Sequence, residues 1–461
     1  MSSWINESIK VSPDGKRTAY TAKLGNKRFV VVDGKEEKQY DAIRNGTPIF
    51  SPDSRRVAYG ASLENKGFVV VDGKEEKHYD NIGAVILVFS PDSNRVAYAA
   101  MLGNKMFIVV DGKEEKYYDG IGAGSFVFSP DSKRIAYGAK LGNKSLVVID
   151  GKEERQYDGI GVSTPIFSPD SKHVAYTANE GKEFFVVVDG KEEKRYDDVT
   201  IPLIFSPDSQ HLAYAVQLND NRFVVVDGKE GKQYDDIGKT LTFSPDSKRI
   251  AYTAVMDNKL SAVIDEKEGK QYDNFEIGTP IFSSDSKRVA YLATLNNKWF
   301  VVVDGMEKLY DDAGIPVFSP DSLHVAYRAK LNGKWFVVLD GKEGKQYDGI
   351  GKTITFSPDS KRIAYGAKEG GKWFVVVDGK EEKQYDDFGE GTLVFSPDSK
   401  SVAYMATMDN NWFVVVDGKK GKEYNGIFIK GGGRIFFDAP NRIHYLAIKD
   451  GGIYLVNEKI E

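Results

Sequence analysis

Short apolar runs and short charged runs alternate along almost the whole chain. The most regular apolar run reads Phe-Val-Val-Val, as at residues 29–32. A run that is apolar on both faces and rich in β-branched residues predicts a strand buried on both sides, as in sheets stacked face to face. An Asp-Gly pair follows at 33–34, and it predicts a tight hairpin because both turn residues require positive φ. Residues 35–41, Lys-Glu-Glu-Lys-Gln-Tyr-Asp, are mostly charged and predict an exposed strand at a sheet edge.

A second hairpin is expected in the same unit. Thr-Pro-Ile-Phe at 47–50 and Arg-Val-Ala-Tyr-Gly-Ala at 56–61 read as strands on either side of Ser-Pro-Asp-Ser at 51–54. The proline presets φ for a type I turn. The pattern thus predicts a meander of four antiparallel strands with the charged strand outside, and no convincing helix pattern appears.

This unit is repeated along the chain. The turn prolines stand 36 to 39 residues apart, counting one serine that replaces a proline, at 13, 52, 91, 130, 169, 207, 245, 284 (Ser), 320, 358 and 397. A period of this size, filled with short strands, is typical of propeller repeats. Because each sheet buries both faces only against its neighbours, we expect the units to be arranged radially as blades.

The repeated Phe-Ser-Pro-Asp-Ser followed by Arg-Val/Ile-Ala-Tyr, as at 50–59 and 128–137, resembles TolB-like propeller repeats, which are relatives of the WD-repeat class. The resemblance spans nearly the whole chain and implies the fold. Related repeats occur in periplasmic binding proteins and beside serine peptidases. The sequence has no Gly-x-Ser-x-Gly segment for a nucleophile elbow, so peptidase activity is not carried over.

Two tyrosines count the blades. The tyrosine of Ala-Tyr marks twelve blades: Tyr20, Tyr59, Tyr98, Tyr137, Tyr176, Tyr214, Tyr252, Tyr291, Tyr327, Tyr365, Tyr404 and Tyr445. The tyrosine that ends the charged strand occurs only eleven times, from Tyr40 to Tyr424. Because residues 1–7 form a strand-like piece before the first turn, we expect them to supply the outer strand of the last blade.

The expected fold is therefore all-β, a β-propeller of twelve four-stranded antiparallel blades. We expect one closed ring over 1–461, with residues 1–7 closing the last blade. The alternative is two six-bladed propellers, 1–238 and 239–461, because propellers typically have four to eight blades.

Composition narrows the function classes. The net charge of −5 and the pI near 5.8 argue against a nucleic-acid partner. The absence of cysteine excludes disulfides, iron–sulfur clusters and thiolate zinc sites. No apolar run approaches the ~20 residues of a membrane span, so we expect no membrane association. With no signal peptide visible, we expect a cytoplasmic protein by default, or a periplasmic or secreted one if a signal was removed. A monomer is expected.

The repeated carboxylates do not suggest catalysis. An aspartate in every turn is typical of backbone capping, whereas an active site requires one distinguished constellation. The histidines His173, His211 and His324 replace a repeat arginine in blades too far apart to share a metal. No metal-ligand spacing is present, so no metal and no cofactor is expected.

Tryptophan gives the clearest asymmetry. Trp299, Trp335, Trp373 and Trp412 hold the same position in four consecutive blades, just before Phe-Val-Val. We predict an aromatic arc that binds a ligand, since tryptophan is enriched at binding hot spots. The alternative is inter-blade packing together with duplication of those blades.

The leading hypothesis is a non-catalytic binding or scaffold propeller that presents a disc face to a protein, peptide or glycan. The first alternative is an enzyme, a lyase or hydrolase, acting at the channel mouth through link charges such as Arg44, Lys239, Lys352 and Glu390. The second is a repeat-amplified structural protein with no specific ligand. Whether the protein is an enzyme stays open at this point, although the uniformity of the repeat favours a non-enzyme.

Overall fold

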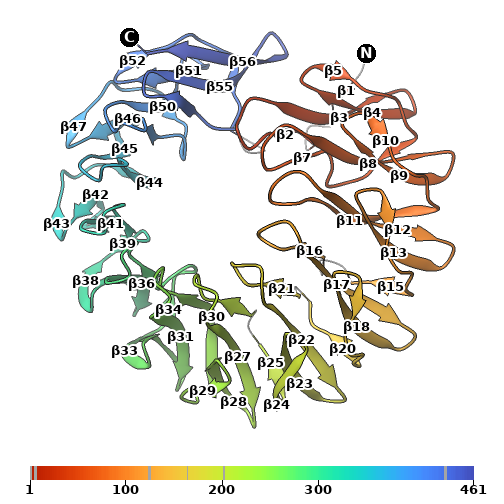
Figure 1. The fold of residues 1–461 in the computed structure, drawn as a ribbon. Coiled ribbons are helices and arrows are strands. Elements are labelled where there is room, and N and C mark those ends of the chain that lie inside the picture. Colours follow the sequence, from red (N-terminus) through yellow and green to blue (C-terminus); the bar gives the residue numbers. More distant parts are fainter. Residues whose placement is uncertain are drawn as a thin grey trace. The chain divides into compact units, whose positions relative to one another are not determined.

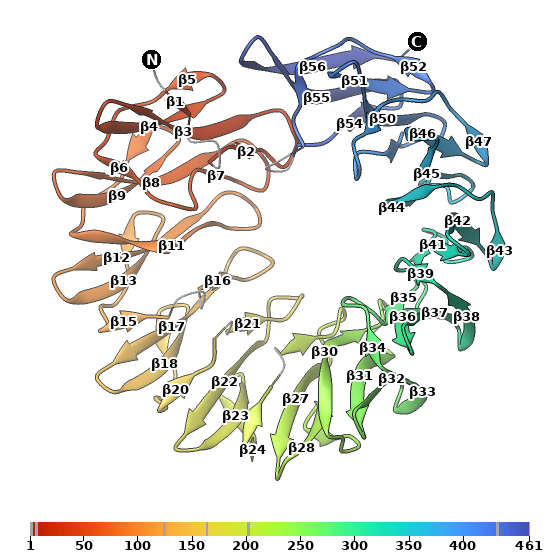
Figure 2. The same ribbon diagram turned by 180° about the vertical axis from the view of Figure 1, so that it is seen from behind.

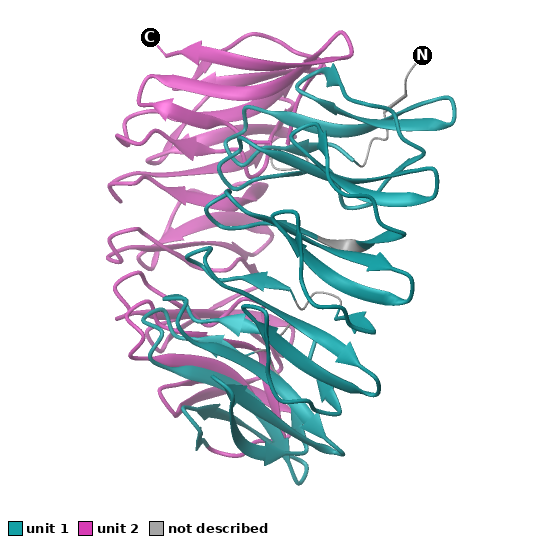
Figure 3. Ribbon diagram, turned by 45° about the vertical axis from the view of Figure 1, so that its right-hand side comes forward, with its two compact units in different colours: residues 1–231 teal, residues 232–461 magenta. Residues whose placement is uncertain are grey.

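The computed structural model describes residues 3–4, 8–122, 126–162, 165–200, 203–429 and 433–460. These residues form strands and turns, and none of them is helical (Figures 1 and 2). The chain divides into two compact units, Met1–Gly231 and Lys232–Glu461 (Figure 3). Each unit contains six antiparallel sheets, and each sheet is one blade. The prediction of an all-β propeller chain of twelve blades is confirmed; the grouping of the blades into one ring or two stays a prediction.

Blade two shows how the sequence builds a sheet. The central strand β8 (Val57–Leu63) pairs on one side with two short pieces, β6 (Ala42–Ile43) and β7 (Ile49–Phe50), which together form the first strand. On its other side β8 pairs with β9 (Lys66–Val71), and β9 pairs with β10 (Lys74–Glu75). The predicted four-strand meander is therefore present.

The other blades repeat this order. The first strand consists of two short pieces in most blades: β1 (Ser3–Trp4) and β2 (Lys10–Val11), β15 (Gly120–Ile121) and β16 (Val127–Phe128), β20 (Gly159–Ile160) and β21 (Ile166–Phe167), β25 (Asp198–Val199) and β26 (Ile204–Phe205), β34 (Asn274–Phe275) and β35 (Ile281–Phe282), β39 (Asp312–Ala313) and β40 (Val317–Phe318), β48 (Asp387–Phe388) and β49 (Val394–Phe395), β53 (Gly426–Ile427) and β54 (Phe436–Ala439). It is one bulged strand in three blades: β11 (Asn81–Phe89), β30 (Asp236–Phe243) and β44 (Gly349–Phe356).

The second and third strands are the longest regular elements. The second strands are β3 (Thr18–Leu24), β12 (Val96–Leu102), β17 (Ile135–Leu141), β22 (Val174–Glu180), β27 (Leu212–Leu218), β31 (Ile250–Met256), β36 (Val289–Leu295), β41 (Val325–Leu331), β45 (Ile363–Glu369), β50 (Val402–Met408) and β55 (Arg442–Lys449). The third strands are β4 (Lys27–Val32), β13 (Lys105–Val110), β18 (Lys144–Ile149), β23 (Glu183–Val188), β28 (Asn221–Val226), β32 (Lys259–Ile264), β37 (Lys298–Val303), β42 (Lys334–Leu339), β46 (Lys372–Val377), β51 (Asn411–Val416) and β56 (Gly452–Lys459).

The fourth strand is charged and lies at the sheet edge. Its regularly paired parts are β5 (Lys35–Glu36), β14 (Lys113–Glu114), β19 (Lys152–Glu153), β24 (Lys191–Tyr196), β29 (Lys229–Glu230), β33 (Lys267–Tyr272), β38 (Met306–Tyr310), β43 (Lys342–Glu343), β47 (Lys380–Glu381) and β52 (Lys419–Lys420). In most blades the chain then bulges away and returns to the sheet at the tyrosine, as where Tyr79 bridges to Gly67.

The hairpin between the third and fourth strands has the predicted geometry. Asp72 and Gly73 have φ values of 51° and 76°, which are the two positive angles that a type I′ turn needs. Blade seven forms the same turn with Asp265 and Glu266, at 51° and 65°.

The cores lie between consecutive blades of a unit. Val70 of blade two packs with Tyr40 and Val30 of blade one, whereas its neighbour Val69 packs with Tyr98 of blade three. Adjacent residues of one strand thus serve opposite faces. The prediction that the apolar run is buried on both sides is confirmed.

The N-terminal strand differs from its prediction. Ser3 and Trp4 form β1, which pairs with β3 of the first blade, at Lys23 and Ala22. They occupy in blade one the position that β6 occupies in blade two. These residues therefore belong to the first strand of blade one. For these two residues, the expected pairing with the last blade is wrong. The other members of the predicted segment, 1–2 and 5–7, lie outside the described residues.

Candidate functional site

The turn aspartates are structural. In blade two, Ser51 donates to Asp53 at 2.6 Å, and Asp53 accepts the backbone N–H of Arg55 at 3.1 Å. The backbone N–H of Asp53 donates to Ser93 of blade three at 2.9 Å. The carboxylate caps its own turn, and the turn is bonded to the next blade. The residue therefore has a structural role.

The repeat arginine joins consecutive blades. Arg56 pairs with Asp72 of its own blade at 2.9 Å and donates to the carbonyls of Ser93 and Asn94 in blade three, at 3.3 and 2.9 Å. Its guanidinium carbon also lies 5.3 Å from the centre of the Phe89 ring. We call this arrangement the arginine clasp. It uses the geometry that distinguishes arginine from lysine, a planar fork of several donors.

Three histidines replace that arginine. His173, His211 and His324 each lie 2.7 Å from the aspartate that the arginine would contact, Asp189, Asp227 and Asp340 respectively. The ion-pair position is kept, but in blades five and nine the shorter imidazole of His173 and His324 makes no hydrogen bond to the following turn among the described residues. No group of three metal-binding side chains occurs in the part of the chain that the structure describes.

The fourth strand also holds the next blade through a buried tyrosine. Tyr98 of blade three donates to Glu76 of blade two at 2.8 Å, and Tyr59 donates to Glu37 at 2.6 Å. Burial raises the pKa of both tyrosines well above the ordinary value, and the carboxylate partner raises it further. These hydroxyls therefore act as fixed donors rather than as acids.

The junction of blades eight and nine departs from this pattern. The fourth strand of blade eight, β38, reads Met-Glu-Lys-Leu-Tyr. It is one residue shorter than its counterparts, such as Lys-Glu-Glu-Lys-Gln-Tyr in blade one and Lys-Glu-Gly-Lys-Gln-Tyr in blade six. It pairs regularly along its whole length, without the bulge. Glu307 retains the role of the first glutamate, since Lys270 and Tyr272 contact it at 2.7 and 2.6 Å. The second glutamate is absent, as it also is where Gly231, Gly269, Gly344 and Gly421 replace it, but only here is the strand one residue shorter.

The shortened strand lies beside a pocket. Tyr327 has no carboxylate to bond and instead lies 3.2 Å from the hydroxyl of Tyr310. A cavity of about 670 Å³ opens here, whose lining includes Val301, Val325, Met306 and Leu323. Lys308, Glu307 and Arg288 are among the charged residues that line it.

Two exposed apolar side chains meet at this pocket. Met306 is 72% exposed and Leu323 is 69% exposed. At the position of Met306 the other Asp-Gly and Asp-Glu hairpins all have lysine, and at the position of Leu323 the other Ser-Pro-Asp-Ser turns all have lysine, arginine, asparagine or glutamine. Sequence reasoning missed this site, although the missing residue and the two substitutions were visible in an alignment of the repeats.

The four tryptophans are half-buried and lie in the same register. Trp299, Trp335, Trp373 and Trp412 each face the tyrosine that ends the fourth strand of the same blade, Tyr310, Tyr347, Tyr385 and Tyr424. Each also packs against an inter-blade core. The ring of Trp373 lies 5.3 Å from that of Phe388, and the guanidinium of Arg328 lies 4.8 Å from the ring of Trp335. Part of each side chain is thus used for packing; its role in ligand binding stays a prediction.

The link charges are distributed over both units. The backbone N–H of Lys352 donates to Glu390, between blades ten and eleven. Arg44, in the other unit, donates to Asn81 and lines a separate cavity of about 550 Å³ with Gly60 and Tyr98. None of the described residues forms a helix long and apolar enough to cross a membrane.

Comparison with known proteins supplies no family. No protein-family model and no curated protein matches the chain. Solved structures similar to it include β-propellers. TolB from Acinetobacter baumannii has 20% identity and a TM-score of 0.24, with 46% of this chain and 62% of that chain covered. The β-propeller domain of the trilobed protease from Pyrococcus furiosus has 16% identity and a TM-score of 0.28, covering 55% and 92%. The Cps50 (Swd1) β-propeller domain from Myceliophteria thermophila has 13% identity and a TM-score of 0.25, covering 53% and 92%.

Proposed function

We propose that the protein is a non-catalytic binding propeller, and that the pocket between blades eight and nine receives an apolar side chain of a peptide or of a protein segment. One observation carries this proposal: Met306 and Leu323, two exposed apolar residues that replace polar repeat residues in different blades, line the same pocket. Exposed apolar side chains beside a cavity favour binding of an apolar group.

The chemistry of the pocket favours a peptide over a glycan. Sugars are usually held by aromatic faces and many hydrogen bonds, whereas Val301, Val325, Met306 and Leu323 give an aliphatic lining. Lys308, which donates to the carbonyl of Gly341 and has no carboxylate partner among the described residues, would pair with a carboxylate flanking the inserted side chain. The repeated use of the turn aspartates and of most repeat arginines in blade-to-blade contacts supports a role in binding rather than in catalysis.

The test is selection from a displayed random-peptide library, followed by affinity measurements on the enriched peptides. We expect Met306→Lys with Leu323→Lys, which restores the lysine found in sister blades, to weaken binding at least about tenfold. A matched control, Lys342→Met with Lys361→Leu, places the same residues at the next junction, where the fourth strand has its full length. It should leave the affinity unchanged. Enriched peptides that bind the lysine variant as well as the unmodified protein would overturn the proposal.

A further inference from the structure

The last blade has a free strand edge. In the described residues, β56 pairs with β55 on one side and no fourth strand pairs with its other side. Tyr454 and Leu455 of β56 are 53% and 41% exposed, whereas the third-strand residues Phe413 and Val414 of blade eleven are both fully buried, at 0%. This edge differs from every other third strand of the described chain.

The register identifies which backbone groups are free. Val456 faces Tyr445 as Val415 faces Tyr404, so Ile453 and Leu455 are equivalent to Trp412 and Val414. In blade eleven those two residues bond the fourth strand: Trp412 exchanges both backbone bonds with Tyr424, at 2.9 and 2.8 Å, and the carbonyl of Val414 accepts from Gly421 at 2.8 Å. Because strand hydrogen bonds alternate in direction, Ile453, Leu455 and Asn457 present the same groups outward.

The other blades show what side chain covers this strand. In three blades the fourth-strand residue before the tyrosine stacks on the third-strand phenylalanine. His78 lies 4.0 Å from Phe68 between ring centres, Tyr117 lies 4.4 Å from Phe107, and the Arg195 guanidinium lies 4.7 Å from the Phe185 ring. Tyr454 is the equivalent of these phenylalanines, and the position opposite it is empty in the described chain.

A lysine near β56 indicates a second contact for an added strand. A fourth-strand glutamate of one blade pairs with a lysine of the preceding blade, as Glu75 with Lys38 and Glu114 with Lys77, each at 2.7 Å. Lys422 of blade eleven holds the same position as those lysines. Among the described residues it has no carboxylate partner, so an acidic residue on a strand beside β56 would complete the pair.

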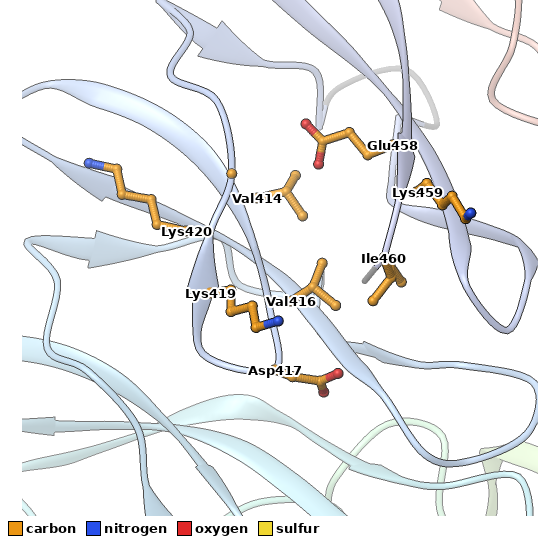
Figure 4. A pocket seen from close by; sticks show the side chains of 9 residues that line it. Val414, Val416, Asp417, Lys419, Lys420, Glu458, Lys459 and Ile460 are labelled. Atoms are coloured by element: carbon orange, nitrogen blue, oxygen red, sulfur yellow. The ribbon is translucent and has the colours of Figure 1, made fainter.

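A pocket beside β56 leaves room next to the edge. Figure 4 shows Glu458, Lys459 and Ile460 on one side of a cavity of about 280 Å³, facing the hairpin that carries Asp417 and Lys419. Gly421 stands where other blades have the second glutamate, and a Cβ there would lie 3.3 Å from Glu458. Glu458 takes over the missing role, since Tyr445 donates to it at 2.9 Å.

We propose that β56 binds an extended peptide segment as an added antiparallel strand. The segment has an acidic residue, four positions before the equivalent of the blade tyrosine, that pairs with Lys422. The residue just before that tyrosine is aromatic or an arginine, and its side chain stacks on Tyr454. Main-chain bonds to Ile453, Leu455 and Asn457 supply affinity, and the side chain on Tyr454 supplies selectivity. The eleven internal fourth strands are the template, so the segment resembles Lys-Glu-Glu-Lys-Tyr-Tyr-Asp, the sequence of residues 113–119.

The experiment uses the full chain and a fluorescein-labelled peptide of that sequence, with binding followed by fluorescence anisotropy. Saturable binding and slowed amide exchange at 453–457 are expected. A peptide with glycine in place of the first tyrosine should bind about two- to fivefold more weakly, the size of one cross-strand aromatic pair. Replacing the first glutamate of the peptide by lysine should also weaken binding, and this loss of affinity should be smaller at high salt.

Two variants of the protein separate edge binding from general damage. Ile453→Pro removes the outward N–H that is equivalent to the Trp412 N–H bonded to Tyr424. It leaves the ladder to β55 intact and should weaken the peptide at least about tenfold. Ile453→Val keeps that N–H and should change binding less than about twofold. Circular dichroism checks that both variants fold. The proposal would be overturned if no peptide bound, or if the proline variant bound the peptide as well as the unmodified protein. It would also be overturned by a dimer of the unmodified chain that the proline variant abolishes, since a second copy of the chain would then occupy the edge.

Discussion

The junction of blades two and three and the junction of blades eight and nine are built from the same strands but are filled differently. At the first, Glu76 reaches Tyr98 at 2.8 Å. At the second, the glutamate is absent and Tyr327 bonds Tyr310 at 3.2 Å beside a cavity of about 670 Å³. The arginine is retained at both, with Arg288 pairing with Asp304 at 2.8 Å. One missing residue in an edge strand thus creates a pocket while the blade-to-blade linkage is kept.

Acid should have the largest effect, because it acts on the turn carboxylate of both junctions and of the other blades. The Ser90 hydroxyl and Asn94 hold the pKa of Asp92 at about 2, below its ordinary 3.8, and Ser319 lowers the pKa of Asp321. A carboxylate with a lowered folded-state pKa stabilises the protein above its unfolded pKa, and this contribution is lost as the pH falls through the folded value. The melting temperature should therefore decrease between about pH 4 and about pH 2.

Asp92→Asn and Asp321→Asn provide the control for this prediction. Each should reduce the pH dependence of the melting temperature slightly, because one titrating group of the set is removed. A melting temperature that stays constant down to about pH 2 would show that these turn carboxylates do not contribute through their charge.

Removing one tyrosine hydroxyl should reduce the free energy of unfolding by different amounts at the two junctions. Tyr98→Phe leaves the Glu76 carboxylate without its donor and should cost about 1.5–3 kcal/mol, the range for hydrogen bonds to charged groups. Tyr327→Phe removes a bond between two neutral hydroxyls and should cost about 0.5–1.5 kcal/mol. Urea denaturation followed by circular dichroism measures both. Equal costs would mean that the carboxylate adds nothing to the first junction.

Exchanging arginine and histidine at the clasp position tests how much the clasp contributes to stability. Arg56→His should keep the contact with Asp72 and lose the bonds to Ser93 and Asn94, at a cost of about 1–2 kcal/mol for a partly exposed group. His324→Arg should add the equivalent bonds to the turn at 357–361 and stabilise the protein by about 1 kcal/mol. The measurement is again the urea midpoint. A neutral result for both exchanges would show that the clasp orders the turn without stabilising it.

The sequence allowed the blade to be predicted strand by strand, because each local signal has one physical reading. Asp72-Gly73 requires two positive φ values, the apolar run at 68–71 requires cover on both faces, and Ser51-Pro-Asp closes a turn. These signals are local and are repeated in most blades, so a copy that departs from the pattern can be interpreted from the others.

The candidate site could not be predicted in the same way, because it arises from a departure from the repeat. Met306 and Leu323 lie in different blades, and only the packing of β38 against β41 brings them to one cavity. The N-terminal strand shows a similar limit. Counting strands indicated an unpaired position in the last blade, but it did not indicate that Ser3 and Trp4 pair with β3.

The smallest expected effect concerns a hairpin that is the same in both regions but differs in blade seven. Glu266 has a φ of 65°, a left-handed conformation that costs a side-chain-bearing residue about 1 kcal/mol relative to glycine. Glu266→Gly should therefore stabilise the protein by about 0.5–1 kcal/mol, after the greater freedom of glycine in the unfolded chain is allowed for.

The reciprocal change, Gly305→Glu in blade eight, isolates the backbone contribution. Gly305 has a φ of 79°, and no atom lies within 4 Å of the position that its Cβ would take, so the glutamate meets no steric obstacle. It should destabilise by about 1 kcal/mol, and the double variant should return close to the starting stability because each change acts through its own backbone conformation. If Glu266→Gly instead destabilises, the glutamate side chain contributes more than its backbone conformation costs, and the Asp-Glu turn is a stabilising variant of the repeat rather than a strained one.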